Sequence, residues 1–141
     1  MIQLIFNVFP LSVNKLYVNI PGQKRRFVST EGKKFKTLIE TEVKTLIKNP
    51  DTLNELAKLE GKCLSMEIKV SSSSWFLKDG KTIRQKDLSS VEKALVDSIF
   101  TAFKDLGFNL DDKQIWSLNL EKEYGISDIT EVKLYEFHKI P

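Results

Sequence analysis

Cysteine and histidine are almost absent from this chain of 141 residues. Its single cysteine, Cys63, has no partner for an internal disulfide, and its single histidine is His138. Zinc sites need three or four Cys or His ligands, and Ser-His-Asp or Cys-His catalysis needs a placed histidine, so both classes are disfavoured. Any bound metal would depend mainly on carboxylates, which favour Mg²⁺ or Mn²⁺ over zinc or copper.

Long apolar runs are also missing. No stretch approaches the roughly 20 apolar residues that span a bilayer, and the opening MIQLIFNVFP has no basic segment ahead of its apolar residues. We therefore expect a cytoplasmic protein without a membrane partner. A chain of this length can bury roughly 68–70% of its unfolded surface, so residues 1–141 are expected to form one domain without disulfides or structural zinc.

Positive and negative charges are separated along the chain. The net charge of +3 combines an excess of six positive charges in residues 1–36, an excess of five negative charges in residues 105–136 and an excess of two positive charges in the rest of the chain. A second basic segment contains Lys78, Lys81, Arg84 and Lys86. This division is compatible with a basic groove around an acidic metal site, which would suit a polyanionic partner. Solvated charged faces would give the same pattern.

The periodicity of apolar residues predicts an α+β fold. Helical spacing indicates helices that start at Ser29 or Thr30, at Asp51 as an N-cap, and near Ser90 after a Ser89–Glu92 capping box. The expected strands cover residues 2–9, 16–20, 64–70, 116–121 and 131–137. We expect a mixed or mostly antiparallel sheet packed with two to three helices.

Trp75 and Trp116 are expected to belong to the core, although Trp75 stands in a basic loop. A base-stacking role for Trp75 would instead suit an RNA-binding α+β module. That interpretation lacks the aromatic strand motifs of such modules.

Four acids and one lysine are candidates for chemistry. Asp87 precedes the last predicted helix, Lys93 and Asp97 lie within it, and Asp111 and Asp112 stand in the following turn. A strand returning beside this helix would bring Asp112 towards Asp87, where two carboxylates could hold Mg²⁺. A purely structural interpretation remains open, with Asp87 as a helix cap, Lys93–Asp97 as a surface ion pair, and the two adjacent aspartates as a polar turn.

The order of motifs resembles the RusA family of Holliday junction resolvases, over most of the chain. The matching segments are Pro10-Leu11-Ser12-Val13-Asn14-Lys15-Leu16-Tyr17, Val28-Ser29-Thr30-Glu31-Gly32-Lys33-Lys34-Phe35-Lys36, the signature from Lys86 to Asp97, and Gly107-Phe108-Asn109-Leu110-Asp111-Asp112-Lys113-Gln114.

The resemblance implies a homodimeric, Mg²⁺- or Mn²⁺-dependent endodeoxyribonuclease that makes paired, symmetric nicks in four-way DNA junctions during recombination and repair, in a prokaryotic or phage-infected cell. It implies that Asp87 and Asp112 bind metal and that Lys93 assists catalysis. Asp97, Asp111 and Ser89 fall at supporting positions. The basic residues expected to contact DNA are Lys15, Lys24, Arg25, Arg26, Lys33, Lys34, Arg84 and Lys86.

The chain departs from the family pattern at two points. Ser89 and Ser90 stand where the pattern has Asp and Asn, so one carboxylate is missing. The spacing between Asp97 and Asp111 is about four residues longer than the pattern, close to one helical turn. The missing carboxylate leaves an alternative open, a junction-binding architectural protein with reduced or lost catalysis.

Overall fold

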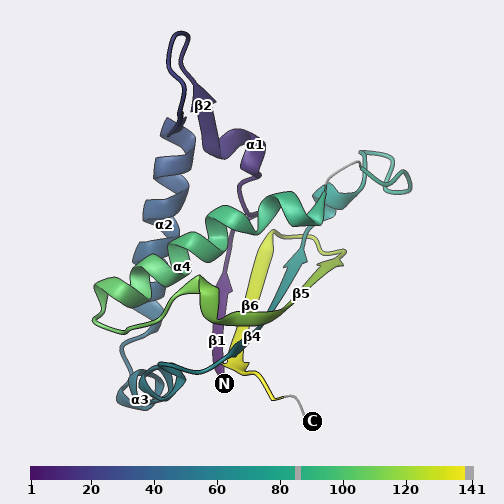
Figure 1. Cartoon of the computed structure of the whole chain (residues 1–141). Helices are drawn as coiled ribbons and strands as arrows, with labels where there is room; N and C mark the ends of the chain where they lie inside the picture. The colour runs from purple at the N-terminus through teal and green to yellow at the C-terminus, as the bar shows by residue number, and fades with distance from the viewer. Residues whose placement is uncertain (85–86, 139–141) are drawn as a thin grey trace.

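A four-stranded mixed sheet forms the centre of the protein (Figure 1). The computed structural model describes residues 1–84 and 87–138. The strands are β1 (Ile2–Phe6), β4 (Leu64–Ser71), β5 (Ile115–Glu123) and β6 (Ile129–Glu136), in the order β1-β6-β4-β5. β6 is antiparallel to both β1 and β4, whereas β5 is parallel to β4. The predicted α+β class and mixed sheet are thereby confirmed.

Helices α2 (Thr30–Leu46) and α4 (Lys93–Asp105) pack against each other over one face of the sheet (Figure 1). Inward side chains of β1, β4 and β6, such as Leu4, Met66 and Val132, are buried in one hydrophobic cluster with residues of both helices. The opposite face of the sheet is polar and carries the ion pairs Lys69–Glu123 (3.2 Å) and Glu131–Lys133 (3.4 Å). The candidate residues of α2 and α4 therefore lie on the helical side of the sheet.

The helix starts follow the local capping chemistry. Ser29 caps α2, because its hydroxyl accepts a hydrogen bond from the Gly32 amide at 2.9 Å. The second helix, α3 (Pro50–Leu59), begins one residue before the expected cap. Asn49 accepts from the Asp51 amide at 2.9 Å, and Pro50 occupies the first helical turn, where a missing N–H costs nothing. The prediction of Asp51 as the N-cap is therefore wrong.

The predicted Ser89–Glu92 capping box is also wrong. Residues Leu88–Val91 form a short 3₁₀ helix, η2, and α4 starts after Glu92, which makes no side-chain capping bond. Asp87 caps η2 instead and accepts from the Ser89 amide at 3.3 Å and the Ser89 hydroxyl at 3.0 Å. A carboxylate is the stronger acceptor, so the Ser89 hydroxyl donates to Asp87 rather than capping the next helix.

Two short elements, α1 (Val13–Leu16) and β3 (Arg26–Val28), were not expected from the sequence. β2 (Tyr17–Asn19) falls within the strand expected over residues 16–20, and it pairs with β3 as an antiparallel hairpin. The hairpin projects from the body beyond the start of α2 (Figure 1). Gly22, with φ of 82°, supplies the left-handed conformation in its turn.

The two tryptophans differ in environment. Trp75, in the 3₁₀ helix η1 (Ser73–Trp75), is 3% exposed, and its indole N–H donates to the Val70 carbonyl at 2.9 Å. Its predicted core position is confirmed, and its ring is too enclosed to stack on a base. Trp116 is 68% exposed and lies beside Phe137, so its predicted core position is wrong. Trp116 is on β5, an edge strand of the four-stranded sheet.

Among residues 1–84 and 87–138, no helix combines the length and apolar character needed to cross a membrane.

Candidate functional site

Asp112 lies in a small hollow beside the middle of α4. The hollow, of about 310 Å³, is lined by Lys36, Asp97, Phe100, Thr101, Lys104 and Asp112, and we call it the Asp112 hollow. Asp112 is the first residue of the 3₁₀ helix η3 (Asp112–Gln114), which follows the turn after α4. Lys36 comes from α2, so two helices and the turn before β5 build the hollow.

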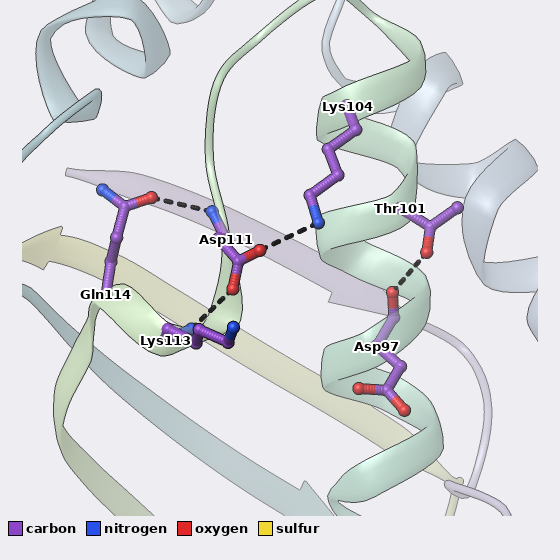
Figure 2. A network of polar contacts seen from close by, with 6 residues as sticks. All are labelled: Asp97, Thr101, Lys104, Asp111, Lys113 and Gln114. Carbon is purple, nitrogen blue, oxygen red and sulfur yellow. Dashed lines mark hydrogen bonds and ion pairs between the residues drawn. The ribbon is translucent and has the colours of Figure 1, made fainter.

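Asp111 fixes the backbone beside Asp112 (Figure 2). Its carboxylate accepts from the Lys113 amide at 2.9 Å and from the Lys104 ammonium at 3.0 Å, while its own amide donates to the Gln114 side chain at 2.7 Å. The Lys113 amide and then the Lys104 side chain lower the pKa of Asp111 to about 2. Asp111 is therefore an ionised anchor of the turn.

Asp112 experiences the opposite electrostatic environment. A hydrogen bond with Asp111 raises the pKa of Asp112, and partial burial and the negative charges of Asp111 and Asp97 raise it further. Asp97 lies on α4, where its carbonyl accepts a hydrogen bond from the Thr101 hydroxyl (Figure 2), and it lines the same hollow as Asp112. Negative charge thus gathers at Asp112, and a cation bound there would be stabilised.

Glu92 belongs to the same electrostatic group. Burial raises the pKa of Glu92, and repulsion from Asp97 and Asp112 adds to this effect. We call Glu92, Asp97 and Asp112 the carboxylate group. Sequence reasoning gave Glu92 mainly a capping role. Its five-residue separation from Asp97 does not place the two side chains at neighbouring positions on a helix, so the spacing did not indicate their proximity.

Lys93 is the cation next to this group. Its ammonium lies 3.5 Å from an Asp97 carboxylate oxygen, and the Asp97 charge is the main reason that the pKa of Lys93 is raised. Tyr17 of β2 contributes a smaller effect in the same direction. Lys93 is therefore a charged, exposed group that remains able to contact an anion.

Asp87 and Ser89 line a separate, larger groove. This groove, of about 750 Å³, is formed by residues 9–15, Glu31, Asp87 and residues 89–91, and we call it the Asp87 groove. Asp87 and Ser89 are both exposed there. The wall of residues 9–15 is attached to α2, because the Ser29 hydroxyl donates to the Lys15 carbonyl at 2.6 Å and the Ser29 amide donates to the Leu16 carbonyl at 2.9 Å.

The structure places Asp87 and Asp112 in different hollows. In the described ranges, 1–84 and 87–138, no hydrogen bond joins them, and no three or more His, Cys, Asp or Glu side chains form a ready-made metal cluster. Asp97 is the acid that shares a hollow with Asp112. The sequence could not show this, because it depends on how the turn after α4 packs against the helix.

The basic candidates come from several separate segments of the chain. Lys24, Arg25 and Arg26 are exposed on the β2–β3 hairpin, and the Arg25 guanidinium lies 5.2 Å from the centre of the Phe27 ring. Lys15 lines the Asp87 groove, and Lys33 and Lys34 are exposed in the first turns of α2. Arg84 is partly buried, and Lys86 lies outside the described residues. Lys36 and Lys104, at the Asp112 hollow, are further basic residues that the predicted site omitted.

Comparison of the sequence with protein-family models and with curated proteins gives no match.

Proposed function

We propose that the protein is a metal-dependent endodeoxyribonuclease that cuts four-way DNA junctions. The observation that carries the proposal is the carboxylate group next to Lys93, of which Asp97 and Asp112 line a hollow together with Lys36 and Lys104. Phosphodiester hydrolysis needs both charge types close together, because carboxylates bind the metal while cations attract and stabilise the phosphate. The motif resemblance supports junction DNA as the substrate.

The chemistry of the donors fits a hard divalent cation. Mg²⁺ commonly takes one or two protein carboxylates and completes its octahedron with water and substrate oxygens, so a ready-made cage of three acids is not required. When bound, the metal would polarise the phosphate and lower the pKa of a water ligand. We assign Asp112 as one ligand and consider Asp87, from the motif, and Asp97, from the shared hollow, as candidates for the second.

The remaining residues have roles that follow from their contacts. Lys93 is placed to stabilise negative charge on the phosphate or the leaving oxygen, since its ammonium is exposed and ionised. Asp111 positions Asp112 through its bonds to Lys104, Lys113 and Gln114. The basic β2–β3 hairpin would hold the DNA backbone. A homodimer in the cytoplasm of a prokaryotic or phage-infected cell completes the proposal, because two identical sites suit two equivalent junction strands.

The decisive experiment is incubation with a synthetic four-way junction in Mg²⁺, Mn²⁺ or EDTA, with cuts mapped on all four strands. We expect paired cuts at symmetric positions that require the metal. Asp112→Asn should reduce cutting by about 10–100-fold or more, because losses of this size are typical when a residue near a metal is replaced. Junction binding should persist or strengthen, because one negative charge is removed from the phosphate path. Undiminished cutting by this variant would contradict the assignment.

A comparison of two further variants identifies the second carboxylate. Asp87→Asn removes an acid of the Asp87 groove, whereas Asp97→Asn removes the neighbour of Asp112 within its hollow. The variant that shifts the Mg²⁺ concentration for half-maximal cutting upward has lost the ligand. Glu40→Gln on α2, outside both hollows, is a matched control that should behave as the parent.

A binding protein with lost catalysis is the second candidate. It is favoured by one observation, the neutral hydroxyl of Ser89 that donates to Asp87 at 3.0 Å where the motif has a second carboxylate. This candidate predicts tight junction binding without cutting in either metal. A large gain of cutting in the double variant Ser89→Asp, Ser90→Asn, from an inert parent, would support it.

A further inference from the structure

A second polar hollow lies at the other end of β5 from Asp112. It has a volume of about 370 Å³, and its lining includes Ser73, Lys78, Arg84 and Tyr124. None of the described residues that line it is acidic. β5 has nine residues, which at about 3.3 Å per residue separate the two ends by roughly 26 Å. We call it the Arg84 hollow.

The segment that carries Arg84 is a braced hairpin rather than a loose loop. The Leu77 amide donates to the Thr82 carbonyl at 2.8 Å, and the Arg84 amide donates to the Trp75 carbonyl at 2.8 Å. Asp79 holds the turn, because its carboxylate accepts from the amides of Lys81 and Thr82 at 2.8 and 2.9 Å. Arg84 is therefore held next to the buried Trp75.

Asp79 is the acid of this hairpin, and its hydrogen bonds are made within the turn. The Thr82 side chain is the main reason that the pKa of Asp79 is lowered, followed by the amides of Thr82 and Lys81. Among the described residues, no ion pair joins Asp79 or another acid to Lys78 or Arg84. The two cations of the hollow thus retain their positive charge for an external anion.

The guanidinium of Arg84 supplies the independent indication of a ligand. Its Nε is buried and, within residues 1–84 and 87–138, has no hydrogen-bond partner. A buried donor without an acceptor is costly, so an oxygen ligand that reaches this N–H would be strongly favoured. The flat fork of guanidinium donors matches the paired oxygens of a phosphate.

Tyr124 forms another part of the wall. Its ring packs edge-to-face on Phe76, with 5.7 Å between the ring centres. This contact ties the turn after β5 to the hairpin that carries Arg84. A tyrosine hydroxyl and the Ser73 hydroxyl are neutral donors of the kind that complete a phosphate site.

We propose that the Arg84 hollow binds a phosphate group of the DNA backbone, with Arg84 as the forked donor and Lys78 as the second cation. The choice of DNA rests on the proposed function. The hollow would hold the substrate roughly 26 Å from the Asp112 hollow and would contribute to affinity rather than to bond cleavage.

The test measures junction binding by fluorescence anisotropy in EDTA over a range of salt concentrations. Arg84→Gln should weaken binding by about ten- to a hundredfold, because a charge-assisted hydrogen bond is lost. The negative slope of log K against log salt should become less steep by about one, because one phosphate contact is lost. Arg84→Lys keeps the charge but loses the buried Nε donor, and should weaken binding about three- to tenfold. Lys81→Gln, at the exposed turn of the same hairpin and outside the hollow, should cost less than about threefold.

Two results would overturn the proposal. One is binding by Arg84→Lys at the parent level, since net charge alone would then explain the affinity. The other is an equal loss in Lys81→Gln and Arg84→Gln. If Arg84→Gln fails to fold, as judged by circular dichroism, Arg84→Lys and the parent protein still decide the question.

Inorganic phosphate provides a direct probe of the hollow. The Arg84 Nε–H resonance of the parent, assigned with Arg84→Lys, should shift on titration with phosphate up to tens of millimolar, and an unchanged resonance would contradict the proposal. These measurements need no metal and no cutting. A protein that binds phosphate through Arg84 without cutting junctions would refute the nuclease and leave the hollow intact.

Discussion

At the scale of single residues, Ser89 is the position with the clearest chemical consequence. Its hydroxyl donates to Asp87, so the two side chains form a neutral–anionic pair that is stable without metal. An aspartate at position 89 would place a second carboxylate against Asp87, and their repulsion would be relieved only by a cation. Under the proposed function, serine at this position would lower the affinity for metal and stabilise the metal-free site.

This effect is testable with Ser89→Asp. We expect the melting temperature without metal to fall by about 1–2 °C, and the rise on adding Mg²⁺ to be larger than in the parent. Mg²⁺-dependent cutting should increase about tenfold. Ser90→Asn, at the neighbouring position without an added charge, is the control. Equal Mg²⁺ responses of Ser89→Asp and the parent would show that residue 89 does not reach the metal.

The raised pKa of Asp112 gives a second prediction at this scale. The folded state holds the Asp112 proton more tightly than the unfolded chain does, because Asp111 and Asp97 disfavour the charged form. The associated stability is present at low pH and is lost as the pH rises through the folded-state pKa. At pH 7, Asp112→Asn should therefore melt about 1–2 °C above the metal-free parent. The difference should vanish near pH 3, which differential scanning calorimetry can measure.

At the scale of elements, the junction between α1 and α2 positions the wall of the Asp87 groove. A Cβ at Gly32 would lie 2.7 Å from the Leu16 carbonyl oxygen and 3.0 Å from a Leu16 methyl carbon. The first contact is with backbone and cannot be relieved by a rotamer change. Gly32 is thus required by close packing inside a helix, where alanine would ordinarily be preferred.

Gly32→Ala should lower the free energy of unfolding by about 1–3 kcal/mol, the usual cost of overpacking, despite the gain in helix propensity. Urea denaturation measures this value. Thr37→Ala, at an exposed position of the same helix, should be neutral or slightly stabilising. If both variants were equally stable, the close approach of α1 to α2 would be dispensable.

Elements with a long periodic pattern could be predicted from the sequence, whereas short elements such as α1 and β3 could not. The seventeen residues of α2 and the eight of β4 present a full buried stripe or alternation. β3 has three residues and depends on pairing with β2, which no local pattern reveals. The same limit applies to the site. The proximity of Asp97 and Asp112 depends on packing, whereas the motif paired Asp87 with Asp112.

At the scale of the whole molecule, charge separation predicts a strong dependence of binding on salt. The exposed cations of the β2–β3 hairpin and of the start of α2 are candidates for phosphate contacts. A protein with six to ten such contacts loses about 10³–10⁵ in affinity between 50 and 200 mM salt. We expect junction binding to fall within or near this range in a filter-binding titration. Affinity that stays constant across these concentrations would exclude a basic DNA surface.

The strand order has a further consequence for how the protein comes into being. β6 lies between β1 and β4, and its Leu134 pairs with Ile2. The chain is made from its N-terminal end, so β1 and β4 lack their common neighbour until residues 129–136 have been added. The packed faces of α2 and α4 have no completed sheet to cover before then. A chain that has not reached β6 therefore exposes apolar surface to chaperones and proteases, and the acids and cations proposed to act on DNA belong to a fold that β6 completes.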